Sequence, residues 1–78
     1  MKHVASIDDK AKKMEAMVGE GLRLAKRVGH VPTFSEYGNY RAELGLKFSE
    51  WQIYREFGGH KGAWSAYQYL IIEATARK

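Results

Sequence analysis

The chain has 78 residues and carries 13 Lys and Arg against 9 Asp and Glu, a formal net charge of +4. This length leaves room for one small domain, and because the chain has no cysteine, hydrophobic packing must support the fold without disulfides. The longest apolar stretch, residues 66–74, is too short to span a bilayer, so we expect no membrane partner, and the absence of cysteine fits a cytoplasmic protein.

The first predicted helix covers about residues 9–28. Asp8 or Asp9 is expected to cap its start, because acidic side chains suit the positive end of the helix dipole. Gly19 and Gly21 weaken a helix interior, so either the middle of this helix is soft or another helix crosses it closely. Apolar and small residues recur with the helical period and form the expected inner stripe: Ala11, Met14, Val18, Gly21, Leu22, Ala25 and Val28.

A capping box predicts the start of a second helix over about residues 34–44. Thr33 can accept a hydrogen bond from the Glu36 amide, and the Glu36 side chain can reach back to the Thr33 amide. Gly45 is well placed to end this helix in a left-handed turn.

The same capping pattern, with Ser49 and Gln52, predicts a short third helix over about residues 50–57, which Gly58-Gly59 would end. The last predicted helix covers about residues 62–77. Its expected inner stripe, with Trp64 at the margin, consists of Ala63, Tyr67, Leu70, Ile71 and Ala74.

No segment alternates with the period of two that is typical of strands. The sequence therefore predicts a small all-α, four-helix domain over residues 9–78, after a flexible N-terminal segment, 1–8. The link 45–48 between the second and third helices has the length and glycine content of the turn in a helix-turn-helix. Phe48 is expected to lie beneath this turn.

Residues 22–67 resemble the homing-endonuclease-associated repeat. The resemblance rests on the run from Leu22 to Thr33, and its most specific part pairs Gly-x-x-Pro-Thr-x-x-x-Tyr, beginning at Gly29, with Ser-x-x-x-Ile-x-x-x-Phe-Gly, beginning at Ser49. This repeat is a small helical module found beside HNH nucleases and in phage and bacterial proteins. The resemblance implies DNA binding through a helix-turn-helix, in a regulatory or accessory protein of a phage or bacterium.

If the third helix reads DNA, Trp51, Gln52 and Arg55 are the residues expected to contact bases, since Gln and Arg pair bidentately with adenine and guanine. Residues 10–32 hold six basic side chains against two acidic ones, whereas residues 33–57 hold three against four. Unless the charged face of the first helix is simply solvated, phosphate contacts are expected from seven basic residues: Lys12, Arg23, Lys26, Arg27, Arg41, Lys47 and Lys61.

An alternative function is protein binding, for example by a phage factor that acts on a host protein. Trp51 and Tyr54 stand beside acidic residues, as in an interface core with a charged rim. Trp51 is expected either to serve a partner or to be covered by the N-terminal segment or the last helix. Tyr69 and Ile72 are expected either to lie under residues 4–7 or to bind a protein partner or a second copy.

The sequence contains no recognisable catalytic or metal-binding constellation. His3, His30 and His60 lie far apart along the chain, and cysteine is absent. We therefore expect no enzymatic activity, no metal or cofactor and no small-molecule substrate. The glycine-rich loop 58–62 precedes the last helix, and it is expected either to bind a phosphate of the DNA backbone or to act as a flexible connector.

Overall fold

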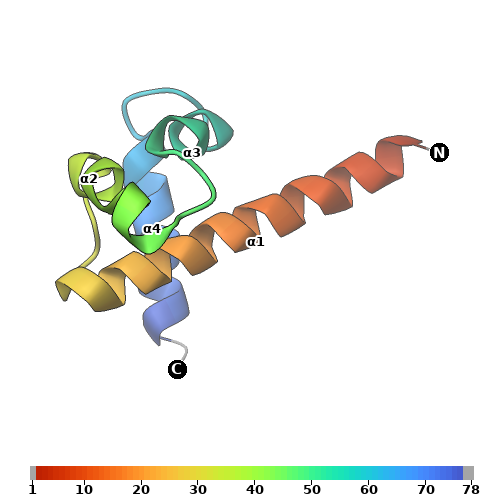
Figure 1. Ribbon diagram of the computed structural model, residues 1–78. Helices are drawn as coiled ribbons and strands as arrows, with labels where there is room; N and C mark the ends of the chain where they lie inside the picture. The colour runs from red at the N-terminus through yellow and green to blue at the C-terminus, as the bar shows by residue number, and fades with distance from the viewer. Residues whose placement is uncertain (1, 77–78) are drawn as a thin grey trace.

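Four helices build the fold, and Figure 1 labels them in chain order. The computed structural model describes residues 2–76, with side chains from residue 9 onward, and this range contains no strand. The helices are α1 (Lys2–Val28), α2 (Phe34–Leu44), α3 (Glu50–Glu56) and α4 (Ala63–Ala76). The prediction of a small all-α, four-helix domain is confirmed.

Helix α1 begins earlier than the sequence pattern predicts. It starts at Lys2 rather than near Asp9, so the backbone of residues 2–8 is helical. Asp8 and Asp9 lie inside the helix, and the prediction that one of them caps its start is wrong. The physical reason is that no glycine or proline interrupts the chain before Gly19.

The buried side of α1 also differs from the predicted stripe. Met17 and Leu24 are buried, although neither belongs to the predicted stripe. Within the stripe only Gly21 is buried, Ala11 is exposed, and the other residues are half-buried. The predicted stripe lies on one face of the helix. In the structure α1 is contacted by α4 and also by the α2–α3 segment (Figure 1), so the most buried residues lie between these two contacts.

Helices α1 and α4 cross closely at Gly21. A Cβ atom on Gly21 would lie 2.5 Å from both Ile71 Cδ1 and Tyr67 Oη, whereas a Cβ on Gly19 would meet nothing within 4 Å. A close crossing therefore accounts for Gly21, as one of the two predicted alternatives states. The Tyr67 hydroxyl donates to the Met17 carbonyl at 2.6 Å, and burial raises the pKa of this phenol.

Both predicted capping boxes are present. The Glu36 amide donates to Thr33 Oγ1 at 3.1 Å, and the Thr33 amide donates to Glu36 Oε1 at 3.0 Å. This bond, together with the adjacent His30 ring, lowers the pKa of Glu36. Gly45 ends α2 with a φ of +64°, as predicted. The third helix ends at Glu56, after which Phe57 forms its C-cap and Gly58-Gly59 follow with positive φ.

The hydrophobic core takes residues from all four helices and from the α2–α3 link. Phe48 is buried there, as predicted. Trp64 was expected at the margin of the inner stripe but is a core residue, and its indole Nε1 donates to the Pro32 carbonyl at 3.1 Å. The core comprises Met17, Leu24, Tyr37, Leu46, Phe48, Ile53, Trp64, Tyr67 and Ile71.

Candidate functional site

The segment from α2 to α3 is fixed in place by Glu20 of α1. The Glu20 carboxylate accepts hydrogen bonds from the amides of Lys47 at 2.9 Å and Phe48 at 3.2 Å. The Tyr37 hydroxyl donates to the Phe48 carbonyl at 3.0 Å and to Glu20 at 3.4 Å. Burial and the Glu20 charge raise the pKa of the Tyr37 phenol. One carboxylate thus satisfies two consecutive amides of the turn and joins it to the core.

Glu20 is a structural determinant of this site that the sequence analysis missed. Its signal in the sequence is weak, because it consists of one acidic residue on the side of α1 that also carries Met17 and Leu24. Its partners lie 27 and 28 residues further along the chain, so no local pattern connects them.

Two of the arginines predicted to contact phosphates bind backbone carbonyls around the turn. Arg41 donates to the carbonyls of Leu46 and Lys47, each at 3.3 Å. Arg23 of α1 donates to the Leu44 carbonyl at the end of α2, at 2.9 Å. These guanidinium groups stabilise the geometry of the turn, so their first role is structural.

Three other basic residues of α1 pair with acidic residues of α2 and α3: Lys10, Lys13 and Arg27. Arg27 forms an ion pair with Glu43 of α2, at 2.9 Å from Nη2 to Oε2, and its guanidinium lies over the Tyr40 ring. At the other end, Lys10 and Lys13 approach Glu56 of α3 at 3.8 and 3.7 Å. Lys10 and Lys13 therefore lie beside the end of α3.

The outer side of α3 exposes Trp51, Gln52 and Arg55, while Ile53 is fully buried. No hydrogen bond or ion pair joins the Arg55 side chain to another described residue. Gln52 is different, because its Oε1 accepts from the Ser49 amide at 2.8 Å and so caps α3. A bidentate contact with adenine needs both ends of the amide. While the cap is intact, the Ser49 amide occupies one lone pair of Gln52 Oε1, which leaves the second lone pair and the Nε2 donors for a base.

Trp51 is the centre of an exposed aromatic cluster. Its ring meets Phe34 of α2 edge-on at 4.9 Å and Tyr54 at 5.7 Å between centroids. Phe34 in turn contacts the buried Trp64 at 5.3 Å. Trp51 remains 56% exposed, so α4 does not cover it. The N-terminal segment, the other predicted cover, lies outside the described side chains.

The other predicted interface residues lie on different parts of the surface. Tyr69 and Ile72 are exposed on α4, and Ile72 borders a groove that includes Leu22 and Val31. Residues 4–7, predicted as their cover, fall outside the described side chains. No aromatic contact among the described residues joins Tyr69 to Trp51 or Tyr54.

The remaining basic candidates are exposed lysines. Lys12 and Lys26 form no ion pair with a described side chain, and Lys61 lies in the loop before α4. Lys47 holds its Nζ over the Phe48 ring at 5.7 Å. In the same loop as Lys61, the Gly62 amide donates to His60 Nδ1 at 3.1 Å, so one amide of the predicted anion-binding loop already has a partner.

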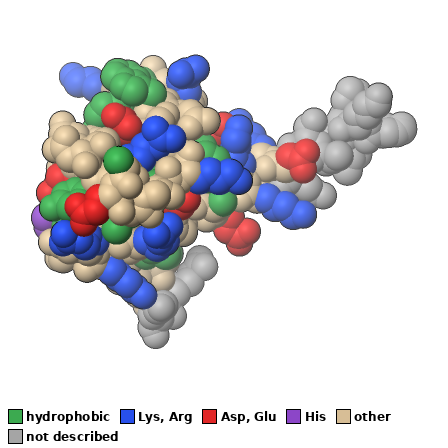
Figure 2. Space-filling view, in the orientation of Figure 1, with side chains coloured by type: hydrophobic (Ala, Val, Ile, Leu, Met, Phe, Trp, Pro, Cys, Tyr) green, Lys and Arg blue, Asp and Glu red, His purple; other side chains and the backbone are tan. Residues whose placement is uncertain are grey.

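Charge on the visible face is mixed rather than segregated. Figure 2 shows Lys and Arg side chains dispersed over the body and along α1, with acidic side chains between them. Within residues 9–76, no group of three or more His, Asp and Glu side chains could hold a metal ion. None of the described helices combines the length and the hydropathy that crossing a membrane requires. Comparisons of the chain with protein-family models, curated proteins and solved structures find no match.

Proposed function

We propose that the protein is a non-enzymatic DNA-binding module in which α3 enters the major groove of duplex DNA. The observation that carries the proposal is the exposed Arg55 on a helix that two capping contacts and the buried Ile53 hold in place. Lysines from α1 stand at the end of the same helix. Arg bound to guanine O6 and N7 is the commonest specific contact between a protein and a base.

Electrostatics around α3 supports this proposal. The sequence places Glu56 where it would repel phosphates, but Lys10 and Lys13 lie close enough to offset that charge. Lys47 precedes α3 and Lys61 follows it, both exposed. Phosphate contacts position a protein on the duplex and supply most of its non-specific affinity, so lysines at both ends of α3 suit a helix that enters a groove.

The resemblance to the homing-endonuclease-associated repeat agrees with this proposal at the level of the scaffold. Several residues that carry the resemblance build the turn or the core: Thr33 caps α2, Tyr37 bonds to the turn, Gly45 ends α2, Ser49 caps α3 and Ile53 anchors it. These residues support the expectation that α3 is held in a position to meet DNA. Base recognition itself depends on the outward residues of that helix.

We expect Arg55→Ala to weaken binding to a preferred duplex by about 1–3 kcal/mol, because the guanine contact is lost. Lys61→Ala is expected to weaken binding equally for all sequences and to reduce the slope of log affinity against log salt by about 1. The measurement is fluorescence anisotropy with labelled duplexes selected from a random pool, titrated at several salt concentrations.

Lys26→Ala is the control for a general loss of positive charge, since Lys26 borders the groove that includes Val31 and Ile72. It should change the affinity much less than Arg55→Ala does. Absence of salt-dependent binding to any selected duplex would contradict the proposal, as would equal effects of the Arg55 and Lys26 substitutions.

A second candidate function is binding to a protein partner through the aromatic cluster. The observation that favours it is the 56% exposure of Trp51, whose ring is oriented by Phe34 and Tyr54. Tryptophan and tyrosine are enriched among the residues that dominate interface energies, and their contact area is large.

If the protein binds a protein partner, the tagged chain is expected to retain one stoichiometric partner from a nuclease-treated bacterial lysate. Trp51→Ala should abolish that retention while leaving the fold intact, because the side chain is mostly outside the core. Tyr69→Ala, which removes another exposed aromatic side chain, is the control and should retain the partner. Retention that survives Trp51→Ala, or that nuclease treatment removes, would argue against this candidate.

A further inference from the structure

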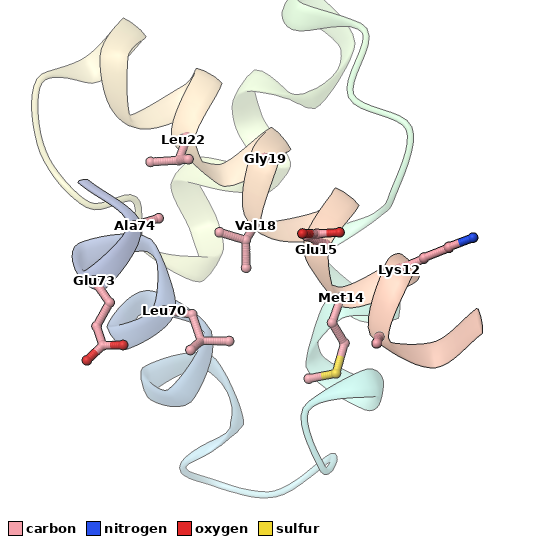
Figure 3. A pocket seen from close by; sticks show the side chains of 10 residues that line it. Lys12, Met14, Glu15, Val18, Gly19, Leu22, Leu70, Glu73 and Ala74 are labelled. Carbon is pink, nitrogen blue, oxygen red and sulfur yellow. The ribbon is translucent and has the colours of Figure 1, made fainter. Parts of the chain in front are cut away.

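An apolar groove runs along α1 where α4 crosses it, and neither candidate function uses it. Its volume is about 590 Å³. Figure 3 shows Met14 and Val18 of α1 and Leu70 of α4 pointing toward the same space. Ala11, Leu22 and Ala74 complete its apolar lining, and Glu15 and Glu73 also border it. Because the stripe predicted for α1 is only half-buried here, the groove leaves apolar surface exposed.

The same side of α1 carries a heptad repeat. Ala11, Met14 and Val18 are separated by three and then four residues, and the sequence continues this spacing toward the N-terminus with Ile7 and Val4. In heptad notation, Val4, Ala11 and Val18 occupy position a, and Ile7 and Met14 occupy position d. Val4 and Val18 at a, with the unbranched Met14 at d, follow the pattern that favours two-stranded, parallel coiled coils, whereas Ile7 at d departs from it.

The N-terminal half of α1 has almost no tertiary support within one chain. Between Asp9 and Ala16, Met14 is the only side chain that is even half-buried. Figure 1 shows this half of the helix extending beyond the other three. Isolated helices shorter than about 12–15 residues are marginal in water, and helices in proteins gain most of their stability from packing of an apolar face. This part of α1 therefore needs a partner for its stripe.

We propose that two copies of the chain pair in parallel through residues 4–18 of α1, forming a short two-stranded coiled coil. The proposal does not rest on DNA binding: the seam residues Ala11, Met14 and Val18 line the groove beside α4, and Lys10 is shared with the surface around α3. In the pair, the a and d residues of each copy pack against those of the other. Leu70 and Ala74 of α4 flank the end of this seam at Val18.

Charge complementarity along α1 favours a second copy of the chain as the partner, and it favours a parallel over an antiparallel arrangement of the two helices. Lys10 occupies position g and Glu15 position e of the next heptad, so in a parallel pair Lys10 of each copy lies beside Glu15 of the other. An antiparallel pair would bring the e positions together, and both Asp8 and Glu15 are acidic. Lys10 is 64% exposed and lies 3.8 Å from Glu56, which also has Lys13 at 3.7 Å. Lys10 can therefore turn to the second copy without leaving Glu56 unpaired.

Cysteine cross-linking tests the pairing directly, because the natural chain has no cysteine and one introduced thiol reports one position. Ala11→Cys and Met14→Cys, at seam positions, are expected to form disulfide-linked dimers under mild oxidation. Ala16→Cys, on the opposite side of the same helix and also exposed in the single chain, is the control and should stay monomeric.

Sedimentation equilibrium of the full chain tests the energetics of the seam. Met14→Glu is expected to raise the dimer dissociation constant more than about tenfold, because a charge would enter an apolar seam. Lys10→Glu should weaken the dimer, and Lys10→Glu combined with Glu15→Lys should restore it by reversing the pair. Circular dichroism at low concentration, where the natural chain is monomeric, checks that each variant keeps its fold.

The possible outcomes either support or overturn the pairing. A chain that stays monomeric at every concentration overturns it, and so does a dimer that Met14→Glu leaves intact. A dimer that Ala16→Cys links as readily as Met14→Cys, or one that the charge reversal does not restore, overturns the parallel seam. Selective links at positions 11 and 14, together with rescue by the double variant, support it.

Discussion

Glu20→Ala is expected to lower the free energy of unfolding by about 2–4 kcal/mol, because the amides of Lys47 and Phe48 and the Tyr37 hydroxyl lose a charged acceptor. The loss should be smaller than a sum over three bonds, since the Lys47 amide is near solvent and the Tyr37 hydroxyl retains the Phe48 carbonyl. Urea unfolding followed by circular dichroism measures it.

The matched control is Glu73→Ala, which removes an exposed carboxylate from α4 and should change the stability by no more than about 0.5 kcal/mol. The loss of stability in Glu20→Gln should lie between those of Glu20→Ala and Glu73→Ala. Glutamine retains one acceptor oxygen, but it also brings an amide donor to a site that already contains donors. Equal stability of the Glu20→Ala and Glu73→Ala variants would show that the α2–α3 turn does not depend on this carboxylate.

Gly21→Ala is expected to destabilise the protein by about 1–2 kcal/mol, even though alanine is the better helix former. The new methyl group would lie 2.5 Å from Ile71 Cδ1 and Tyr67 Oη, and Tyr67 cannot move freely because its hydroxyl is bonded to Met17. Thermal unfolding measures the difference.

Gly19→Ala is the ideal comparison, since it makes the same chemical change two residues earlier in the same helix. Its methyl group would meet nothing within 4 Å, so only the helix propensity changes, and we expect stabilisation by up to about 1 kcal/mol. Effects of the same sign at the two positions would contradict the close crossing of α1 and α4 at Gly21.

The parts of the fold that could be predicted depend on neighbours in the sequence. Both capping boxes join residues three positions apart, and the left-handed Gly45 is a property of one residue, so local chemistry is enough to locate the ends of α2 and the start of α3. The beginning of α1 was not predicted correctly, because a pair of acidic residues can cap a helix or can lie within an uninterrupted one.

The candidate site was less predictable because its contacts join distant segments. That Arg23 and Arg41 bind carbonyls rather than remaining on a free basic face depends on where α2 ends in space. A helical wheel assigns a face to Arg23 but not the Leu44 carbonyl opposite it. The capping role of Gln52 could be predicted, since in a capping box the amide oxygen of this residue accepts a hydrogen bond from the N-cap amide.

The ring of Phe34 stands between the only two tryptophans of the chain, 4.9 Å from exposed Trp51 and 5.3 Å from buried Trp64. The exposed indole and the buried indole therefore share contact with one ring. A ligand that binds only the native state over Trp51 stabilises it by RT ln(1 + L/Kd), where L is the free ligand concentration, so the melting temperature rises with ligand concentration. Intrinsic fluorescence should then carry two signals, one from a solvated indole that reports contact and one from an enclosed indole that reports unfolding.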